Sequence, residues 1–497
     1  MGALFWFFMP KVSIIIPVCG QADMTKKCLE TLYKFTPKDL IEIIVINNNS
    51  PDNTLEMLKA FPDVKVITNE MNKSFSVSIN QGVNESTGEF VLPLNNDTYF
   101  FQNWLEEMLE TFTDKKVAVV GAKLLFPDGK IQHAGLACYK NKQPFHVFWG
   151  EMPSEKNNIQ VEYPAVTFAC ALIRRKVFEE LQGLSLEYPD GNYEDVDFCL
   201  RAREKGYKIV YNPKVVLYHL EAGTKKLDLT RAQDTIRKNL KIYKDKWEKR
   251  SESLFAVDQR IFPKILVGCP TYYKYEYCLE KYAKIVKNLM YPNYDILLID
   301  NSPDEEYMEK IQDVGLKVEQ TPYRKKARDR IVESRNLLKK RTLKGNYDYM
   351  FSLEQDVIPE PDILKKLLSH DKKIISGFYF SPQKLMNGDV AIKPIIFKFH
   401  KKEGKWGTCR MLTKDETWSD ELMNIAYCGV GCLLVHKDVL EKVTFRYKDD
   451  KDATDDKYFC YDARKADFEI WADASVKCKH LLEEKFDWDE LRDKGEY

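Results

Sequence analysis

Two acidic residues, one in each half of the chain, follow apolar runs that are typical of buried strands. Asp97 follows residues 90–94, and Asp356 follows residues 349–353. A carboxylate in such a place can bind a hard divalent cation such as Mg²⁺ or Mn²⁺, because these ions prefer oxygen ligands and bridge to phosphate oxygens. For either acid taken alone, an Asx turn that ends the strand is the simpler interpretation.

Three carboxylates, Glu194, Asp195 and Asp197, lie within four positions where a helical period begins. The helix dipole favours acids in a first turn, so capping could account for them. Three acids are nevertheless more than a cap requires, and a carboxylate in a cleft can act as a general base. Asp455 and Asp456 hold the same place in the second half. We therefore take Asp195 and Asp456 as candidate bases.

A histidine ends a valine-rich run in each half, at His219 and His480. A lone histidine is usually structural, but the same placement twice favours metal ligation. His219 lies 122 residues after Asp97, and His480 lies 124 residues after Asp356. Chance rarely keeps such a spacing within matching apolar context, which indicates that one domain is duplicated.

The elements that must position these residues repeat as well. In each half, apolar runs of about four to six residues alternate with stretches of helical period, which is typical of βαβ units and a mostly parallel sheet. The runs that match are residues 12–17 and 265–270, 43–46 and 296–299, 90–94 and 349–353, and 168–175 and 428–435. Ligands of such sheets bind beyond the carboxyl ends of the strands, so we expect the polar strand ends to share one cleft in each half.

Length and charge limit the classes of function. The 497 residues are enough for two or more domains. With 76 basic and 76 acidic residues the chain has no net charge, which argues against general nucleic-acid binding. We expect a first domain over residues 1–250, closed by a helix at 236–247, a linker over 251–262 and a second domain over 263–497.

The cysteines and the first residues bear on location. The 12 cysteines are scattered and contain no CxxC pair, which predicts reduced thiols in a cytoplasmic protein. Residues 2–9 are very apolar but far shorter than the ~20 residues that span a bilayer. Translation that starts at Met9, an interfacial anchor and a strand extension all fit this run, and we favour the first. No other stretch is predicted to span a membrane, and peripheral membrane contact is left open.

In this order the motifs resemble those of the family-two glycosyltransferases of GT-A fold, and the resemblance covers nearly the whole chain twice. In the first half it rests on the Ile-Ile-Pro run that ends at Pro17, the turn Asn48-Asn49-Ser50-Pro51-Asp52-Asn53-Thr54, Asn72 with Asn80-Gln81-Gly82, Leu94-Asn95-Asn96-Asp97, Glu194-Asp195, Gly206-Tyr207, Asn212-Pro213 and His219. Singly these motifs are loose, but in this order they are specific.

The resemblance implies two tandem α/β, Rossmann-like domains of GT-A fold that bind nucleotide-diphosphate sugars with Mn²⁺ or Mg²⁺. It implies metal ligation by Asp97, His219, Asp356 and His480, and acceptor activation by Asp195 and Asp456. The donor contacts that it implies are Pro17, Asn47, Asn49, Asn80, Asn95, Asp300, Arg328, Asn336 and Glu354. Family members invert the anomeric centre in one in-line displacement, and a metal neutralises the charge that builds on the leaving diphosphate.

The chain departs from the family pattern at several positions. Asn47 stands where the family commonly has the Asp that contacts the nucleobase, which is weaker evidence for a uridine donor. Ser74 replaces the usual glycine, and Ala466-Asp467 replaces the usual Lys-Gly pair. Arg328 and Arg335-Asn336 sit where family members often carry Arg and Asn near the donor phosphates, although a solvated helix face also explains so basic a segment.

These features together predict a bifunctional cytoplasmic glycosyltransferase that resembles two-domain polysaccharide synthases. Its partners would be a nucleotide sugar and a glycan or glycolipid acceptor, with no nucleic acid. One alternative has one active domain and one degenerate domain that holds the acceptor. Another is a non-catalytic carbohydrate- or nucleotide-binding protein on the same fold, which the acids kept in both halves disfavour.

Overall fold

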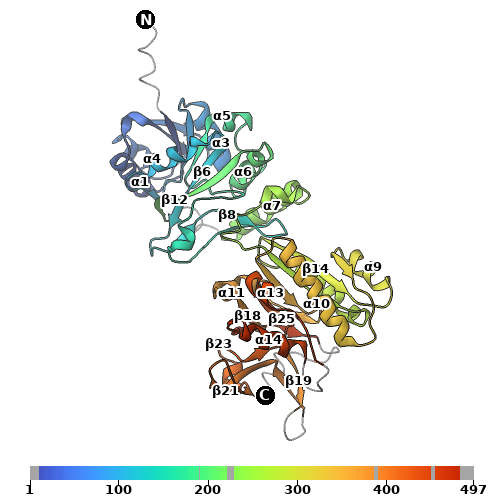
Figure 1. The fold of residues 1–497 in the computed structure, drawn as a ribbon. Helices are drawn as coiled ribbons and strands as arrows, with labels where there is room; N and C mark the ends of the chain where they lie inside the picture. Colours follow the sequence, from blue (N-terminus) through green and yellow to red (C-terminus); the bar gives the residue numbers. More distant parts are fainter. Residues whose placement is uncertain (1–10, 190, 221–228, 385–389, 449–453, 482–497) are drawn as a thin grey trace. The chain divides into compact units, whose positions relative to one another are not determined.

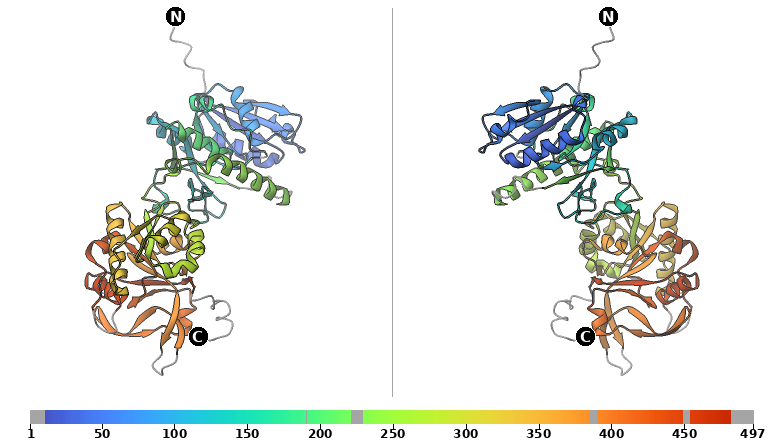
Figure 2. Two further views of the ribbon diagram at one scale, coloured as in Figure 1. Left: turned by 90° about the vertical axis from the view of Figure 1, so that its right-hand side faces the viewer. Right: turned by 90° about the vertical axis from the view of Figure 1, so that its left-hand side faces the viewer.

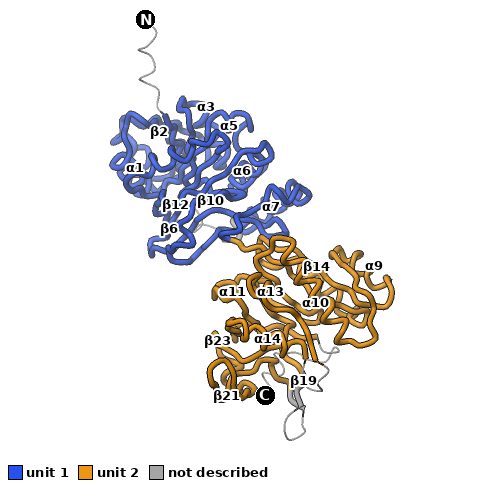
Figure 3. Tube along the Cα trace, viewed as in Figure 1, with its two compact units in different colours: residues 1–261 blue, residues 262–497 orange. Residues whose placement is uncertain are grey.

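The computed structural model describes residues 11–189, 191–220, 229–384, 390–448 and 454–481. The chain divides into two compact units, residues 1–261 and 262–497 (Figure 3). The predicted start at Met9 lies outside the described residues. In the part of the chain that the structure describes, no helix is both long and apolar enough to cross a membrane.

The first unit is built on a sheet with the strand order β10-β12-β6-β11-β4-β1-β2-β3 (Figure 1). Its strands are β1 Val12–Val18, β2 Ile41–Asn48, β3 Val64–Asn69, β4 Phe90–Pro93, β5 Thr98–Tyr99, β6 Val117–Leu125, β7 Ile131–His133, β8 Leu136–Cys138, β9 Pro144–His146, β10 Val161–Glu162, β11 Ala171–Arg174 and β12 Lys208–His219. Its α-helices are α1 Ala22–Phe35, α2 Thr54–Leu58, α3 Phe75–Asn84, α4 Trp104–Glu110, α5 Arg175–Glu180, α6 Glu194–Glu204 and α7 Leu229–Trp247.

The sheet is mixed, whereas the sequence predicts a mostly parallel one. Strands β4, β1, β2 and β3 run parallel, as do β6 and β12. Strand β11 lies between β4 and β6 and runs antiparallel to both. An apolar run that is buried on both faces has the same composition in either direction, so the sequence pattern does not reveal its reversal.

Strand β1 is apolar apart from Ser13, and helices cover both of its faces (Figures 1 and 2). Ile14 and Ile16 belong to a core cluster with Leu29 of α1 and Trp104 of α4. Ile15 faces the other way, toward α3, where a Cβ added to Gly82 would lie 2.3 Å from its Cγ2 atom. Parallel strands buried on both faces give the continuous Ile/Val runs seen in the sequence.

The second unit repeats this topology strand for strand. Its sheet has the order β23-β26-β18-β25-β16-β13-β14-β15, and each neighbouring pair has the direction of its counterpart in the first unit. Its strands are β13 Ile265–Thr271, β14 Tyr294–Asp300, β15 Val318–Gln320, β16 Tyr349–Leu353, β17 Val357–Ile358, β18 Ile374–Phe378, β19 Phe380–Lys384, β20 Val390–Pro394, β21 Ile396–Glu403, β22 Trp406–Met411, β23 Leu422–Asn424, β24 Tyr427–Cys428, β25 Cys432–His436, β26 Trp471–Lys477 and β27 Lys479–His480. Its α-helices are α8 Leu279–Val286, α9 Glu306–Asp313, α10 Ala327–Lys344, α11 Ile363–Ser369, α12 Lys414–Thr417, α13 Lys437–Lys442 and α14 Asp455–Lys465.

The predicted closing helix of the first unit is confirmed as α7. Its Trp247 is buried, and the Trp247 Nε1–H donates to Asp197 Oδ1 of α6 at 3.0 Å. The Asn239 amide donates to the backbone oxygens of Pro189 and Gly191, just before α6. Helix α7 therefore holds the loop that leads into the acidic start of α6.

A short antiparallel pairing brings the end of the last strand back to the acid in both units. His219 lies opposite Thr98 in the first unit, and His480 lies opposite Val357 in the second. The residue after each histidine donates its N–H to the backbone oxygen of the acid, at 3.1 Å to Asp97 and 2.7 Å to Asp356. Backbone pairing thus sets the positions of both acids and both histidines.

Candidate active site

The acid and the histidine predicted to act together are in contact in each unit. The His219 Nε2 atom lies 3.1 Å from Asp97 Oδ1, and the His480 Nε2 atom lies 3.1 Å from Asp356 Oδ2. All four side chains are largely buried. Each pair lies beyond the carboxyl end of a central strand, β4 or β16, where ligands of α/β sheets bind.

Hydrogen bonds on the far ring nitrogen orient both imidazoles. His219 Nδ1 lies 2.6 Å from Gln132 Oε1, and His480 Nδ1 lies 2.5 Å from the backbone oxygen of Phe380. Because these oxygens only accept hydrogen bonds, the Nδ1 atoms carry a proton and a neutral ring keeps its lone pair on Nε2. This is the orientation of a metal-ligating histidine, whose other nitrogen donates to a supporting group.

Two further contacts differ between the pairs. In the first unit Asn95 Nδ2 lies 3.1 Å from His219 Nε2, so an amide joins the pair. In the second, burial lowers the pKa of His480, but its hydrogen bonds to Asp356 and to Phe380 outweigh burial and the net pKa is raised. Without a cation, a proton between His480 and Asp356 stabilises that pair.

The residues present fit a divalent cation that a substrate helps to bind. Asp356 Oδ1 is buried and has no hydrogen-bond partner. Among the described residues, no group of three or more His, Cys, Asp and Glu side chains is arranged to hold a metal. Each unit would therefore bind its own ion through one acid and one histidine, and phosphate oxygens and water would complete the shell, as is common for Mg²⁺.

The candidate base of the first unit, the half-buried Asp195, lies beside the buried Glu194 at the start of α6. The Val196 N–H donates to Asp195 Oδ1 at 2.8 Å, and Thr167 and Phe168 lie close enough to this carboxylate to act to lower its pKa. Burial raises the pKa of Asp195, and it raises the pKa of Glu194 to about 8, with the nearby Asp195 adding to the shift. At neutral pH the pair therefore retains a proton.

The matching acids of the second unit are paired with a buried arginine. Arg335 of α10 is 4% exposed. Its Nη1 lies 2.8 Å from Asp456 Oδ1 and also bonds Asp455, and its Nη2 lies 2.8 Å from Glu354 Oε1. Burial alone would lower the pKa of Arg335, but the three carboxylates raise it. Burial still raises the pKa of Glu354 to about 7, against the effect of Arg335.

Two predicted donor contacts, Asn80 and Asn336, have their amides occupied by backbone. Asn80 donates to the Leu184 oxygen and accepts from the Leu184 N–H, both at 2.9 Å. Asn336 forms the same two bonds with Phe445, at 2.9 and 3.1 Å. These bonds favour a structural role for both amides. The matching bonds show that Asn80 of α3 and Asn336 of α10 occupy equivalent positions in the two units. Ile79 of the first unit therefore corresponds to Arg335 of the second.

The other predicted donor residues lie at different depths. Asn47 and Asp300 are buried at the ends of β2 and β14, and Pro17 is half-buried near the end of β1. Asn49 is exposed in the following turn with a left-handed φ of 53°. Arg328 is exposed in the first turn of α10, before the buried Arg335. The structure thus groups Asn95 and Glu354 with the acid–histidine pairs, but not Arg328.

Sequence reasoning missed two side chains of these clusters. Gln132, which orients His219, belongs to no motif and follows an ordinary turn. Arg335 is visible beside Asn336, but the sequence suggests phosphate as its partner and not Asp456, which lies 121 residues away.

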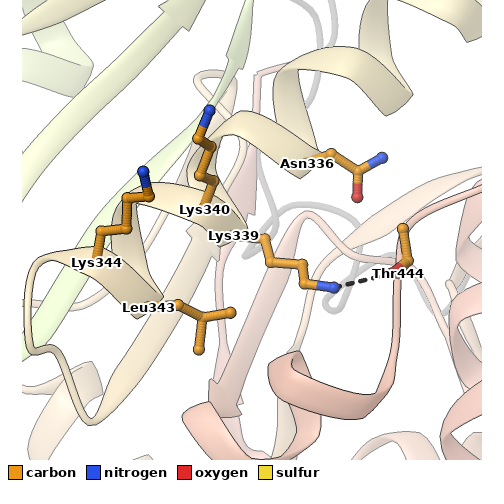
Figure 4. A pocket seen from close by; sticks show the side chains of 6 residues that line it. All are labelled: Asn336, Lys339, Lys340, Leu343, Lys344 and Thr444. Carbon is orange, nitrogen blue, oxygen red and sulfur yellow. Dashed lines mark hydrogen bonds between the residues drawn. The ribbon is translucent and has the colours of Figure 1, made fainter.

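A cavity of about 390 Å³ lies against α10, and none of the acids or histidines of these clusters lines it (Figure 4). Its lining comprises Asn336, Lys339, Lys340, Leu343, Lys344 and Thr444. Lys339 Nζ donates to Thr444 Oγ1 at 2.8 Å, so this lysine is already held within the wall. The lining carries no carboxylate or histidine, and we therefore do not place the active site there.

Comparisons with known proteins relate part of the chain to glycosyltransferases. Residues 13–182 match the family model described as glycosyl transferase family 2. An uncharacterised protein of Sinorhizobium fredii is 32% identical over 44% of this chain and 25% of its own length. The O-antigen biosynthesis protein RfbC of Myxococcus xanthus is 29% identical over 44% of this chain and 18% of its own. Glycosyltransferase AglE of Haloferax volcanii is 26% identical over 42% and 67%.

The family match and the named relatives support a glycosyltransferase. The chain spans a quarter or less of the length of the first two relatives. A solved mannosyltransferase of Pyrobaculum calidifontis, in complex with GDP-Man and Mn²⁺, is 19% identical with a TM-score of 0.36, and it covers 48% of this chain and 65% of its own. That likeness is too low to carry an argument. The segment that matches the family model, residues 13–182, contains Asp97 but ends before Asp195 and His219.

Proposed function

We propose that the chain is a bifunctional glycosyltransferase in which each unit moves a sugar from a nucleotide-diphosphate donor to a glycan acceptor. The observation that carries the proposal is the acid–histidine pair, which occurs at the same place in both sheets with the same 3.1 Å separation. The shared strand order of the two sheets supports tandem domains of one origin.

In the proposed reaction Asp195 takes the proton of an acceptor hydroxyl. The acceptor oxygen then forms a bond to the anomeric carbon while the bond from that carbon to the diphosphate oxygen breaks on the opposite face, which inverts the centre. Asp97 and His219 would hold a divalent cation, which when bound neutralises charge on the departing diphosphate.

Three observations support the proposed partners and location. The carboxylate clusters need a cation before they can accept a diphosphate, which supports Mn²⁺ or Mg²⁺ as cofactor. One relative is named for O-antigen biosynthesis, which supports a glycan or glycolipid acceptor. The 12 cysteines are all free, which supports a reducing compartment such as the cytoplasm.

A second candidate function follows from Arg335. In the second unit the candidate base Asp456 is already paired with this arginine at 2.8 Å, whereas no Lys or Arg pairs with Asp195 among the described ion pairs. Burial raises the pKa of Asp456 overall, but Arg335 opposes that rise and so makes Asp456 a weaker proton acceptor than burial alone would. One active first unit beside a second unit that only holds the acceptor is therefore the alternative.

Transfer assays on the full chain test both candidates. We would supply Mn²⁺, a panel of nucleotide sugars and glycan acceptors, and compare the protein with Asp97→Asn, Asp356→Asn and the exposed control Asp128→Asn. Two active sites predict that each of the first two variants loses a different sugar addition. Loss only with Asp97→Asn supports a single active unit. Unchanged transfer in both variants would contradict the proposed sites.

The role of the base has its own test. Asp195→Asn keeps the size and hydrogen bonding of the side chain but cannot take a proton, so transfer at the first site should fall while donor binding is retained. Loss of donor binding in this variant would show that Asp195 has been assigned the wrong role.

A further inference from the structure

Trp149 of the first unit carries a large aromatic ring that is both held in orientation and open to solvent. Its ring meets Phe126 at a centroid distance of 4.9 Å and an interplanar angle of 87°, and His146 at 5.4 Å and 61°. Such edge contacts between rings fix their relative orientation. The side chain of Trp149 is nevertheless 48% exposed. The ring therefore presents an apolar surface whose direction is already set.

The turn that carries Trp149 is strained. Phe148 has a φ of 59°, in the left-handed region that bulky side chains rarely adopt. Such a conformation is unfavourable and persists only where the surrounding structure holds it. Here the Gly150 N–H donates to the Ile131 oxygen at 2.8 Å, and the Glu151 N–H donates to the Phe148 oxygen at 3.0 Å. Strained residues cluster at functional sites, and the side chain that this turn presents to solvent is Trp149.

Hydrogen bonds connect the support of Trp149 to the surroundings of the candidate base. His146 Nδ1 lies 3.0 Å from Nδ1 of the buried His133. The Thr167 N–H donates to His133 Nε2 at 3.3 Å, so a neutral His133 carries its proton on Nδ1 and donates it to His146. Burial lowers the pKa of His133 well below its usual range, which keeps the ring neutral. The side chain of Thr167 in turn lies close enough to Asp195 to act to lower its pKa.

The other support of Trp149 lies at the edge of the sheet where ligands bind. Strands β4 and β6 both run antiparallel to β11, which lies between them, so their carboxyl ends share one edge. Asp97 lies just beyond β4, and Phe126 directly follows β6. His219, the partner of Asp97, is also close enough to His133 to help lower its pKa. Trp149 thus belongs to the same edge of the sheet as the acid–histidine pair.

We propose that Trp149 is a stacking platform for the glycan acceptor of the first unit, away from the reacting hydroxyl. This inference rests on the proposed function. The terminal sugar offers its hydroxyl to Asp195, and a sugar further along the glycan packs on the ring of Trp149. An aromatic ring suits this ligand because a pyranose has C–H groups on its faces and hydroxyls at its rim. Three residues in series, Thr167, His133 and His146, separate Asp195 from Trp149, so one sugar does not span both.

The size of the patch favours a glycan over a protein partner. Within residues 126–158, all of which the structure describes, the exposed large apolar side chains are Trp149 and Met152. An aromatic side chain buries about 150–250 Å² in a contact. A stable protein–protein interface buries about 800 Å² on each partner. One ring is therefore enough for a sugar but not for a protein.

Acceptor length is the variable that tests this inference. Transfer would be followed in the Asp356→Asn protein, so that only the first unit acts, with chitin-, cellulose- and mannan-derived acceptors from the monosaccharide to the tetrasaccharide. Trp149→Ala should weaken binding of the tetrasaccharide, measured as acceptor KM, about 3- to 10-fold more than that of the monosaccharide, which is the affinity that one aromatic contact contributes. The donor KM should change little, because the diphosphate lies at Asp97.

Two further variants provide controls. Trp149→Phe keeps a ring and should retain most of the preference for the longer acceptor. Met152→Ala removes an apolar side chain that is 60% exposed in the same loop and should leave the preference unchanged. An equal loss for both acceptor lengths in Trp149→Ala, or the same selective loss in Met152→Ala, would overturn the inference.

Other occupants of the patch predict different results. If Trp149→Ala leaves transfer unchanged but abolishes binding to phosphatidylglycerol vesicles or self-association of the chain, the ring contacts a membrane or a second copy, and the inference is wrong. If the unaltered protein glycosylates none of the acceptors, the proposed glycosyltransferase function itself fails, which is a distinct result.

Discussion

Arg335 offers the sharpest test of how the second site is built. Arg335→Met removes the only buried cation that contacts Glu354, Asp455 and Asp456 among the described ion pairs. Removing one partner from a buried ion pair costs about 3–5 kcal/mol, and we expect a value near the lower end because the three remaining carboxylate side chains are 13–33% exposed to water. For a unit of this size, a loss of that magnitude lowers the melting temperature by roughly 6–20 °C.

The same helix supplies a matched control. The side chain of Arg341 is 44% exposed and pairs with Glu319 at 2.7 Å. A surface pair of this kind is worth about 0–1 kcal/mol, so Arg341→Met should change stability little. Both substitutions replace a long cationic side chain of α10 by the same apolar one, so helix propensity is matched.

Hydrogen exchange measured by mass spectrometry gives a readout for each unit. Peptides that cover β16 should lose protection in Arg335→Met but not in Arg341→Met, while peptides that cover β1 should be unchanged in both. The defect should shrink as the pH falls from 8 to 5. Without the arginine, the pKa of Glu354 lies even further above its ordinary value, so the folded protein gains stability by holding that proton at low pH and loses it as the pH rises.

Equal protection of β16 in the two variants at pH 8 would refute this reasoning. Such a result would mean that the acids around Arg335 are solvated in solution or neutralised by another group, and that the arginine does not define the site. A defect that grows on acidification would also contradict it, because protonation must relieve a cluster of uncompensated carboxylates.

Three further predictions concern the first unit. In urea titrations, Glu194→Gln should raise the free energy of unfolding of the first unit by roughly 2–4 kcal/mol at pH 9 and leave it unchanged at pH 4.5. The reason is that the folded protein raises the pKa of Glu194 to about 8, so its stability falls as the pH rises from the ordinary pKa of Glu toward that value. Trp247→Phe removes a donor from buried Asp197 and should cost about 1–3 kcal/mol in the same assay, whereas Trp149→Phe, at a residue that is 48% exposed, should cost far less. Gln132→Met frees Nδ1 of His219 and should raise the Mn²⁺ concentration needed for transfer about 10- to 100-fold, with activity restored at saturating metal.

The acid–histidine pairs could be predicted from the sequence because the repeat presents each signal twice. Asp97 alone fits an ordinary turn, but spacings of 122 and 124 residues to a histidine in the two halves are hard to explain unless one domain is duplicated. Helix α7 was predictable from its length and charge, and α6 from its apolar spacing. All of these features can be predicted from the hydrophobic pattern of a short segment or from the internal repeat of the sequence.

Features set by distant partners could not be predicted. The amides of Asn80 and Asn336 bond to backbone 104 and 109 residues away. Two of the three partners of Arg335, Asp455 and Asp456, are 120 and 121 residues away, and a basic helix gives no sign of which cation is buried. The reversed strand β11 is as apolar as its parallel neighbours, so its direction depends on how the chain enters the sheet.

The pairing of Arg335 with Glu354 shows how the two halves have diverged. Where the second unit has Glu354 and Arg335, the first has the uncharged Asn95 and Ile79, so the extra negative charge in one cluster comes together with an extra positive one. Both clusters consequently carry the same formal charge when ionised. Either change made alone would unbalance its cluster, so the two are expected to be tolerated only jointly. Exchange of both residues between the halves should therefore be accepted more readily than exchange of one.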